Sequence, residues 1–451
     1  MNKTVLALIV AALPLAALAE PPVQNLLSTY HQARESDPVW ASAQNANLAA
    51  QEKLVQGKAL LLPTATLGAN AGHTHTDLDR AGGITNIGRS GYDDYETYGY
   101  SLNINQPLYR KQNSIQYEQS KIQVAQAGEQ LNTANQELML RVSQAYFDVL
   151  LAQDKIDLIA AQKSAISRQL EQAKANFEVG SSTITDVHEA QARFDLTLAQ
   201  EIAAVNELEA KKHAIQAVTG QMPQRLATAK NDLHAAIPEP AEMEKWVETA
   251  EQNNLALKIQ RQSLQLANQE VERTRAGHLP TLDVVGSYND TRANGGTSSD
   301  LVGYNRGMKA ATVGLQLEIP LYQGGAISSR AREAVANQQK TQDDVEAARR
   351  QADLQARQAF LNVTSSVAQV KAYEQALVSS QSQLDSTSLG YDVGVRTSVD
   401  VLNAQQQFYS AKRDLLQARY SWLLSVLRLK AAAGVLSETD LAATNSLLDG
   451  S

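Results

Sequence analysis

Cysteine is missing from this chain of 451 residues, and aromatic residues and long apolar runs are scarce. Without cysteine there is no disulfide framework, no thiol nucleophile, no thiolate metal site and no N-terminal cysteine to carry a lipid anchor. Tyrosine outnumbers phenylalanine 15 to 5 within an aromatic share of 5%, which suits long helices with small-residue seams better than a compact globular core. The formal net charge of −8 argues against nucleic acid as a partner, because nucleic acid is bound through basic patches.

Residues 1–19 are interpreted as a secretory signal peptide. Lys3 precedes an apolar run, and Ala17-Leu18-Ala19 forms a small-x-small cleavage site. A buried N-terminal helix fits these flanks less well. The mature chain has no further apolar run of about 18 residues, so if it crosses a membrane it is expected to do so as a β-barrel.

Motifs of enzymes and cofactor sites are also missing. The sequence contains no phosphate loop, no His-Glu zinc motif and no nucleophile elbow. His73 and His75 would face the same side of a strand and could hold a metal, but without a third ligand they are better interpreted as loop or pore-lining histidines. We therefore predict no catalytic residues, no cofactor and no metal site, and we do not expect an enzyme.

The first half of the mature chain, residues 20–234, is predicted to form one structural repeat. Its elements are a helix over 24–60 with a break at Ser36-Asp37-Pro38, a β-hairpin over 62–109 with a polar loop at 77–96, a long helix over 111–177 and a return helix over 185–219. Apolar residues alternate with small or polar ones in the hairpin, which indicates strands. The stretch 111–177 has no proline and a single glycine, so one helix about 100 Å long is expected.

A second repeat, residues 235–451, is predicted from matching sequence. Leu279-Pro280-Thr281 corresponds to Leu62-Pro63-Thr64, and Gly434 corresponds to Gly220. The expected elements are a helix over 242–276, a β-hairpin over 279–322 with a polar loop at 289–309, a long helix over 326–391, a return helix over 399–434 and a short C-terminal tail. Correspondence over nearly the whole mature chain indicates an internal duplication.

Two turns join each long helix to its return helix. They contain Val179-Gly180 and Val393-Gly394, and each places an aspartate six residues after the glycine. Glycine permits the positive φ that ends a helix, and serine, threonine or aspartate can cap the next one. A seven-residue spacing of apolar residues that begins at Val401 and Leu402 indicates a coiled-coil seam.

Four strands per chain are too few to close a membrane barrel, for which about eight strands is the practical minimum. Tyrosines near strand ends, such as Tyr98, Tyr109 and Tyr322, suit the aromatic girdle of such a barrel, so the strands of several subunits are expected to combine. The alternative, the edge of a soluble sandwich, is disfavoured because the helices are far too long to cover a small sheet.

The sequence resembles the TolC family of outer-membrane efflux and type I secretion ducts. The resemblance covers essentially the whole mature chain and is most specific in residues 177–187, 277–283, 320–325 and 391–402. It implies a mainly α fold with membrane β: a homotrimer whose twelve-stranded β-barrel continues into a twelve-helix periplasmic α-barrel. Connectors such as 221–241 and the C-terminal tail would form an equatorial belt.

The resemblance also implies roles for residues at the two turns. A periplasmic gate would be formed by Gln169, Thr185, Asp186, Tyr391 and Arg396. Asp186 would face Tyr391 within one subunit, and Arg396 would reach Thr185 and Asp186 of the next subunit. Arginine suits this contact because its planar fork can bind a carboxylate and a hydroxyl together.

A selectivity ring and docking tips are implied as well. Asp400 would form the ring, with Asn403 where the family often has a second acidic residue and Ser388 where it has a glutamate. Helix capping is the alternative role for both aspartates; we assign it to Asp186 and a pore role to Asp400. The adaptor-docking tips would be Val179, Gly180 and Ser181 on the first turn and Val393, Gly394 and Val395 on the second.

The expected function is a passive exit duct of tripartite efflux pumps or type I protein secretion. The resemblance implies an iris gate that opens when a periplasmic adaptor and an inner-membrane transporter of the RND, ABC or MFS type dock. The chain is expected in the outer membrane, in contact with its lipid and extending into the periplasm, and drugs, toxic small molecules and proteins all remain open as cargo. The alternative class, a periplasmic coiled-coil adaptor without a pore, does not account for the two hairpins or the duplication.

Overall fold

The computed structural model describes residues 23–78, 91–230, 233–294 and 306–448, so the predicted signal peptide lies outside the described residues. The chain divides into two compact units. Unit 1 comprises Met1–Ala43, Asn132–Asn254 and Gln351–Ser451, and unit 2 comprises Gln44–Leu131 and Leu255–Arg350. Each unit takes segments from both predicted repeats, so units and repeats divide the chain differently, and the repeats stay a prediction.

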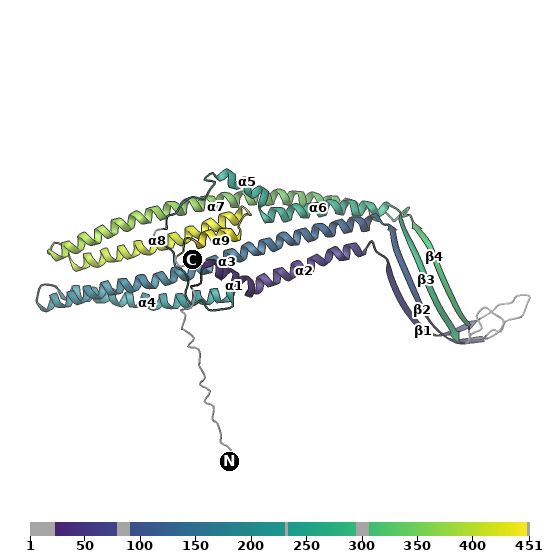
Figure 1. Cartoon of the computed structure of the whole chain (residues 1–451), viewed down its shortest axis with the longest axis horizontal. Coiled ribbons are helices and arrows are strands. Elements are labelled where there is room, and N and C mark those ends of the chain that lie inside the picture. Colours follow the sequence, from purple (N-terminus) through teal and green to yellow (C-terminus); the bar gives the residue numbers. More distant parts are fainter. Residues whose placement is uncertain (1–22, 79–90, 231–232, 295–305, 449–451) are drawn as a thin grey trace, which may run out of the picture. The chain divides into compact units, whose positions relative to one another are not determined.

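The β-sheet of unit 2 is antiparallel and has four strands in the order β1-β2-β3-β4 (Figure 1). These are β1 (Thr64–Leu78), β2 (Gly91–Tyr109), β3 (Thr281–Asn294) and β4 (Arg306–Glu318). Because β2 pairs with both β1 and β3, the two predicted hairpins lie in one sheet. Within the described residues β1 and β4 each pair with one strand only and form the two edges of the sheet.

One face of this sheet is apolar and the other is polar. Leu67 lies opposite Leu102 on the apolar face, whereas on the other face Asn103 lies opposite Ser287. The large side chains of the apolar face are exposed in the single chain, namely Leu67, Tyr98, Tyr100, Leu102, Ile104, Val313, Leu315 and Leu317. The arrangement agrees with the alternation in the sequence and leaves an apolar surface without a partner in one subunit.

The strands are longer than the sequence predicted. Residues 77–96 and 289–309 were expected to be polar loops, but β1 continues to Leu78, β2 begins at Gly91 and β3 continues to Asn294. An antiparallel ladder is made by the main chain, and polar pairs facing each other across it can add to its stability. The ring Nδ1 of His75 lies 2.5 Å from Asp94 Oδ1 in the neighbouring strand, which is one such pair.

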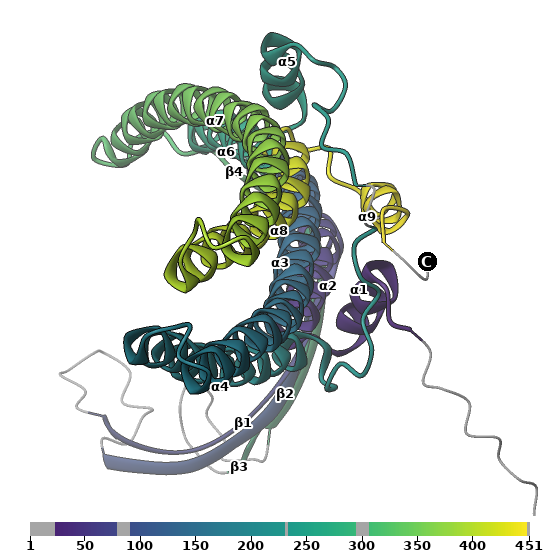
Figure 2. The same ribbon diagram turned by 90° about the vertical axis from the view of Figure 1, so that its left-hand side faces the viewer.

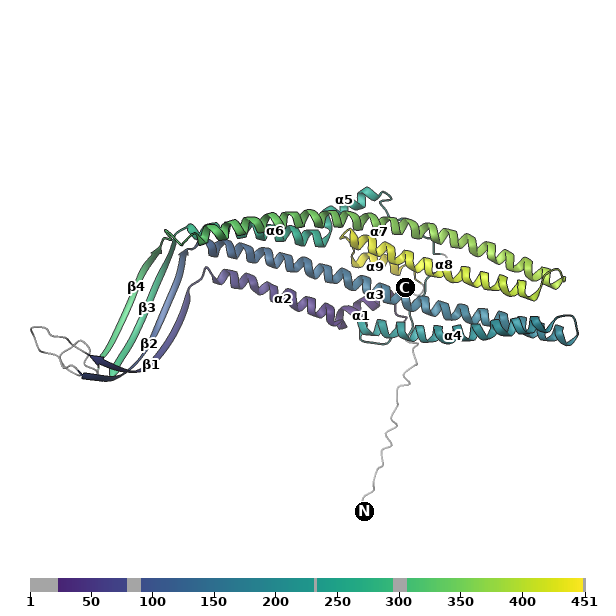
Figure 3. The same ribbon diagram turned by 180° about the vertical axis from the view of Figure 1, so that it is seen from behind.

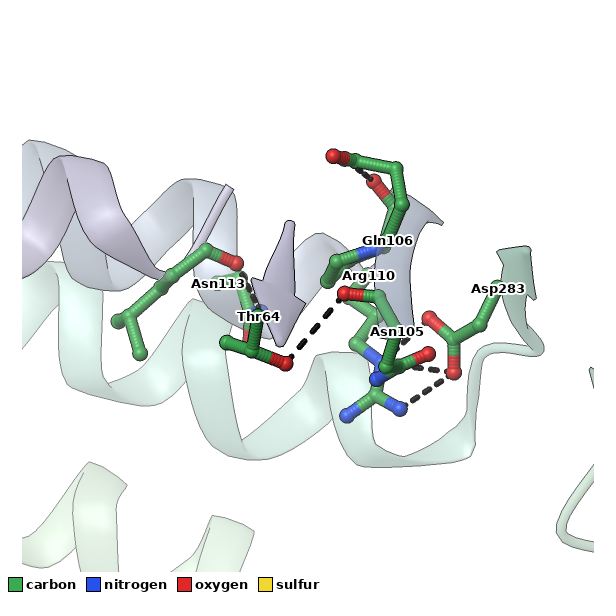
Figure 4. A network of polar contacts seen from close by, with 8 residues as sticks. Thr64, Asn105, Gln106, Arg110, Asn113 and Asp283 are labelled. Atoms are coloured by element: carbon green, nitrogen blue, oxygen red, sulfur yellow. Dashed lines mark hydrogen bonds and ion pairs between the residues drawn. The ribbon is translucent and has the colours of Figure 1, made fainter. Parts of the chain in front are cut away.

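Side-chain contacts hold the junction between the sheet and the helices of unit 2 (Figure 4). Arg110, which follows β2, forms a two-pronged ion pair with the buried Asp283 of β3. The amide nitrogens of Gln106 and Asn113 donate to main-chain oxygens in segment 60–61 over 3.0 and 2.7 Å. These bonds tie the end of β2 and the start of α3 to the connection that leads into β1, so the chain direction is fixed where strand becomes helix.

The two longest helices, α3 (Lys111–Glu178) and α7 (Ala326–Asp392), extend through both units. In unit 1, α4 (Ile184–Thr219) runs back along α3 and α8 (Ser398–Ala432) runs back along α7 (Figures 2 and 3). Lys163 pairs with Glu201 between α3 and α4, and Arg419 pairs with Glu374 between α8 and α7. None of the described helices combines the length and hydropathy needed to span a lipid bilayer.

The predicted single helix over 242–276 is wrong. It is broken at Asn254 into α5 (Met243–Asn253) and α6 (Leu255–Arg275), which a short 3-10 turn extends over Ala276–His278. Asn254 has an extended ψ of 124°, and its side-chain amide donates to the main-chain oxygen of Ala432 at 3.0 Å. That tertiary hydrogen bond compensates for the interrupted helix.

Two further helix assignments concern the chain ends. The expected break at Ser36-Asp37-Pro38 separates α1 (Leu26–Ser36) from α2 (Pro38–Ala59). There the buried carboxylate of Asp37 pairs with Arg141 of α3. The predicted C-terminal tail contains a short helix, α9 (Glu438–Asn445), whose Asp440 pairs with Lys430 of α8.

Candidate functional site

The two turns that join the long helices have the same main-chain geometry. Gly180 and Gly394 have positive φ angles of 76° and 82°. The N–H of Gly180 donates to Phe177 and the N–H of Ser181 to Asn176, both at 2.9 Å. The second turn repeats this pair of bonds. The pattern is a Schellman motif, in which a left-handed glycine ends the helix and its last carbonyls remain bonded.

The helix after each turn begins with the same capping box. The hydroxyl of Thr183 accepts from the N–H of Asp186, and the Asp186 carboxylate accepts from the N–H of Thr183 at 3.0 Å. Thr397 and Asp400 form the identical pair of bonds. Capping, the alternative that the sequence left open for both aspartates, is thus present at Asp186 and at Asp400, and the pore role of Asp400 stays a prediction. The Thr-x-x-Asp spacing at both turns is typical of a capping box and could have indicated this from the sequence.

These hydrogen bonds affect both carboxyl groups. The main-chain N–H and the hydroxyl of Thr397 hold the pKa of Asp400 below its usual value. Partial burial raises the pKa of Asp186, but hydrogen bonds from Ser182 and Thr183 outweigh it, and the pKa is lowered. Both aspartates are consequently charged at neutral pH.

The tips of the turns carry exposed apolar side chains. Val179 is 78% exposed, and Val393 and Val395 are 66% and 75% exposed. A Cβ atom added to Gly180 or Gly394 would have no heavy atom within 4 Å. Together with the exposed Ser181, the predicted docking residues thus form two small apolar surfaces that are open to a partner.

The structure gives Tyr391 a different partner from the one expected. Its hydroxyl accepts a hydrogen bond from the side-chain amide of Asn176 at 3.0 Å, which links α7 to α3. The carboxylate of Asp186 is bonded to Ser182 and Thr183 instead. The predicted contact of Asp186 with Tyr391 is therefore replaced by the Asn176–Tyr391 bond, which sequence reasoning missed.

Two other predicted gate residues also lie near the turns. Gln169 is buried, and its amide donates to the hydroxyl of Ser398 at 3.2 Å, joining α3 to the start of α8. Thr185 is exposed in the first turn of α4. A cavity of about 290 Å³ is lined by Gln169, Tyr391, Ser388 and other residues of α3, α7 and α8.

Arg396 projects from the second turn beside a glycine. A Cβ atom on Gly390 would stand 2.7 Å from the Cγ of Arg396, so the missing side chain at 390 leaves room for the arginine. Within the subunit, hydrogen bonds from Thr397 are the main reason why the pKa of Asp400 is lowered, and the charge of Arg396 lowers it further. Contacts of Arg396 with another subunit stay a prediction.

Asn403 follows Asp400 by one helical turn and is exposed. Its side-chain oxygen accepts from Arg193 Nη2 at 3.1 Å, which connects α8 to α4. A small apolar core in the same region joins α3, α4 and α8. Its buried residues are Ile166, Leu170, Ala173, Ala190 and Leu402. Leu402 of the predicted heptad belongs to this core, and Val401, Leu415 and Trp422 of the heptad are also buried.

The histidines considered as metal ligands lie on β1. His73 Nε2 is 4.0 Å from the same Asp94 oxygen that His75 approaches at 2.5 Å. In the part of the chain that the structure describes, no group of three or more His, Cys, Asp or Glu side chains is arranged to hold a metal ion.

A comparison of the sequence with known protein families shows which family the chain belongs to. The sequence profile described as "Outer membrane efflux protein" matches residues 29–221 and 246–435. The chain belongs to the outer membrane efflux protein family. The resemblance predicted from the turn and strand motifs is confirmed, and so is the outer-membrane location.

Relatives of this efflux protein match nearly its whole length. Outer membrane protein TolC of Vibrio cholerae is 37% identical over 425 residues, which cover 94% of this chain and 93% of the relative. Proteases secretion protein PrtF of Dickeya chrysanthemi is 32% identical over 423 residues, or 92% of this chain and 89% of the relative. These relatives serve efflux and type I secretion in the outer membrane, and this chain shares that duct function.

A solved structure shows the same fold. The outer membrane protein VceC from Vibrio cholerae aligns with a TM-score of 0.73 at 19% sequence identity, over 91% of the efflux protein and 96% of VceC. The family consists of channel-forming efflux proteins rather than enzymes, and the alternative of an adaptor without a pore is set aside.

Proposed function

We propose that this outer-membrane efflux protein assembles as a homotrimer whose twelve strands close one membrane β-barrel. The long helices of three subunits would continue the barrel as a hollow periplasmic duct. Drugs, toxic small molecules or proteins would pass through it without energy input from this protein. Both the efflux and the secretion role are supported, because the chain is similar to TolC and to a protease secretion protein.

The four-stranded sheet carries the proposal. Its strands contain up to 19 residues, longer than the 9–11 or so that a membrane-crossing strand needs. Its edges, β1 and β4, have no second neighbour among the described residues, and unpaired edges cannot stay exposed in lipid. At least about eight strands are needed for closure, so the four strands of one chain are too few and several copies must combine. The number three comes from the resemblance to the TolC family, which implies a trimer.

The helices support the same assembly. In α4 the apolar side chains of Leu198, Ile202 and Val205 are exposed in the single chain. Apolar residues at such spacing on one helical face favour burial against another helix. The neighbouring subunit would supply that helix in the duct. The internal duplication would give each subunit two similar helix pairs, so the wall would have near-sixfold regularity.

The two turns would form the periplasmic gate. In each subunit the bond from Asn176 to Tyr391 and the bond from Gln169 to Ser398 join the helix pair α3/α4 to the pair α7/α8. Arg396 would add a link to Thr185 and Asp186 of the next subunit. Opening the iris would require these links to break in all three subunits together.

The pore constriction and the docking tips complete the proposal. Three copies of Asp400 would form an acidic ring that favours cations, and Asn403 would leave the second position of the ring uncharged. A periplasmic adaptor would dock on the exposed tips around Gly180 and Gly394 and bring an inner-membrane transporter of the RND, ABC or MFS type. Outer-membrane lipid would surround the apolar face of the sheet.

The assembly is tested with protein purified from outer membranes in mild detergent. Light scattering should give three chains per particle, and unheated samples should migrate on gels as a trimer that heating converts to monomer. The same particles should form pores in planar bilayers. A monodisperse monomer with full strand content would refute the trimeric barrel.

A further inference from the structure

A charged cluster interrupts the apolar face of the sheet near the end that lies away from the helices (Figure 1). In the strand register Asp290 lies opposite both Tyr100 and Lys309, and Arg292 lies opposite Tyr98. Residues directly opposite each other in an antiparallel sheet share a face. The cluster therefore lies on the face that carries the exposed leucines and valines, and none of its residues has a role in the duct, the gate or the docking tips.

The carboxylate of Asp290 organises this cluster. The hydroxyl of Tyr100 donates to Asp290 Oδ2 at 2.9 Å. Arg292 Nε lies 3.6 Å from one carboxylate oxygen and Lys309 Nζ lies 3.9 Å from the other. Both distances exceed a hydrogen bond, so the carboxylate attracts these two nitrogens without accepting a hydrogen bond from them.

Burial separates the anion from the cations. The Asp290 side chain is 2% exposed, whereas those of Arg292 and Lys309 are 55% and 64% exposed. An approaching ligand would thus meet two cationic heads, with the carboxylate behind them. The two exposed cations face one buried carboxylate, and the next acidic side chain on this face is the exposed Glu96 of β2, which lies opposite Asn294. The attraction for an anion is therefore local to the heads of Arg292 and Lys309.

The cluster lies directly beyond the apolar side chains of β3, on the same face. Those side chains run from Leu282 to Tyr288, about 20 Å along the strand, which is roughly 15 Å of height at the tilt of about 35–45° found in outer-membrane barrels, whose apolar band is about 25 Å tall. The next residue on that face is Asp290. The rings of Tyr100 and Tyr288 lie 6.4 Å apart at the same level, as expected for an aromatic girdle.

We propose that Arg292 and Lys309 bind the phosphate of a lipid headgroup in the outer leaflet of the outer membrane. The inference rests on the proposed membrane barrel, which would place the apolar face against acyl chains and the cluster among headgroups. Arginine can hold phosphate through two parallel hydrogen bonds, and lysine adds a point charge. A phosphorylated lipid fits better than free phosphate, because its acyl chains would lie against the leucines and valines just below the cluster.

The test compares the double variant Arg292→Gln/Lys309→Gln with the matched variant Lys340→Gln/Arg350→Gln. The latter removes two exposed cations from α7, each paired with a carboxylate on the same helix. Trimers are exchanged into vesicles of phosphatidylcholine containing a small fraction of fluorescent lipid A, a phosphorylated glycolipid, and retention of lipid A is measured. The cluster variant should bind lipid A at least about tenfold more weakly than wild type, since each basic residue near a membrane surface contributes measurably to anionic lipid binding. The matched variant should bind like wild type.

Two further readouts separate the possible failures. Millimolar inorganic phosphate should leave lipid A retention unchanged; equal competition would show a site for free anions and overturn the lipid assignment. Unweakened retention by a cluster variant that still forms pores would overturn the inference while leaving the proposed duct intact. Wild-type protein that formed no pores would overturn the duct and the lipid site with it.

Discussion

Asp186 and Asp400 each cap a helix in the structure, and each is also proposed to act in the assembled channel. In both residues the capping hydrogen bonds go to Oδ2, which leaves the other carboxylate oxygen for a second interaction. The structure shows the capping role of both residues, and the gate and ring roles stay proposals. A substitution that removes the whole carboxylate therefore cannot distinguish loss of the ring charge from loss of the helix cap.

The selectivity ring is tested by a substitution that keeps the cap. Asp400→Asn retains an oxygen acceptor for Thr397 but removes the charge, so it should abolish most of the cation preference of the pore without weakening the start of α8. Reversal potentials in a salt gradient across a planar bilayer measure that preference. Asp186→Asn makes the same chemical change at the matching cap and should leave the preference intact. An unchanged reversal potential in Asp400→Asn would remove Asp400 from the ring.

The same residue gives a pH dependence. Because hydrogen bonds from Thr397 lower the pKa of Asp400, the carboxylate stays charged in mildly acidic solution. The cation preference should persist as the pH falls from neutral and should disappear only below the ordinary aspartate pKa of about 3.9. A preference that disappeared near neutral pH would have to come from another group.

The gate is also tested by changes at single residues. Tyr391→Phe removes the acceptor of the Asn176 bond, and Arg396→Ser removes the proposed link between subunits. Each is worth about 1 kcal/mol or less, but three copies act together, so the double variant should raise single-channel conductance several-fold. Tyr373→Phe, on the same helix, should leave conductance unchanged. A double variant with wild-type conductance would show that these residues do not hold the iris.

At the scale of helices and strands, local patterns predicted most elements and the break at Ser36-Asp37-Pro38, but not the break at Asn254 or the ends of the strands. The stretch 111–177 lacks helix breakers, and the structure has α3 over Lys111–Glu178. The break at Asn254 depends on a hydrogen bond to Ala432, 178 residues away, which no local pattern can reveal. The polarity of the side chains likewise led us to predict strand ends that are too early, because main-chain pairing continues through polar residues.

The turns themselves are tested through their glycines. A bulky charged residue, as in Gly180→Arg or Gly394→Arg, should prevent adaptor docking and abolish export, because the surface beside each glycine is open to a partner. The matched control is Gly325→Arg, since Gly325 also has a positive φ, 79°, and open space around it but lies at the start of α7. It carries the same backbone strain and should still allow export. Susceptibility to toxic compounds, measured at equal protein levels, reports the outcome. If all three variants behaved alike, strain rather than docking would explain the loss.

At the scale of the whole molecule, the sequence predicted the protein family well and the side-chain contacts between helices less well. The family motifs led to the correct family, and the alternating faces and heptad led to a sheet and coiled coils. The partner of Tyr391 was missed because it depends on how α7 is rotated against α3, which spacing within one helix does not fix. The cluster at Asp290 was missed because the expected loop at 289–309 removed it from the strands.

The open edges of the sheet have a genetic consequence. In the proposed trimer β4 of one subunit pairs with β1 of the next, so every interface joins two different edges. A chain damaged only at β1 could still enter a trimer through its intact β4 and leave the ring unclosed. With equal amounts of damaged and normal chains, only about one trimer in eight would contain normal copies alone if three subunits combine at random. Edge-strand alleles should therefore be dominant, whereas alleles that prevent the strands from folding at all should be recessive.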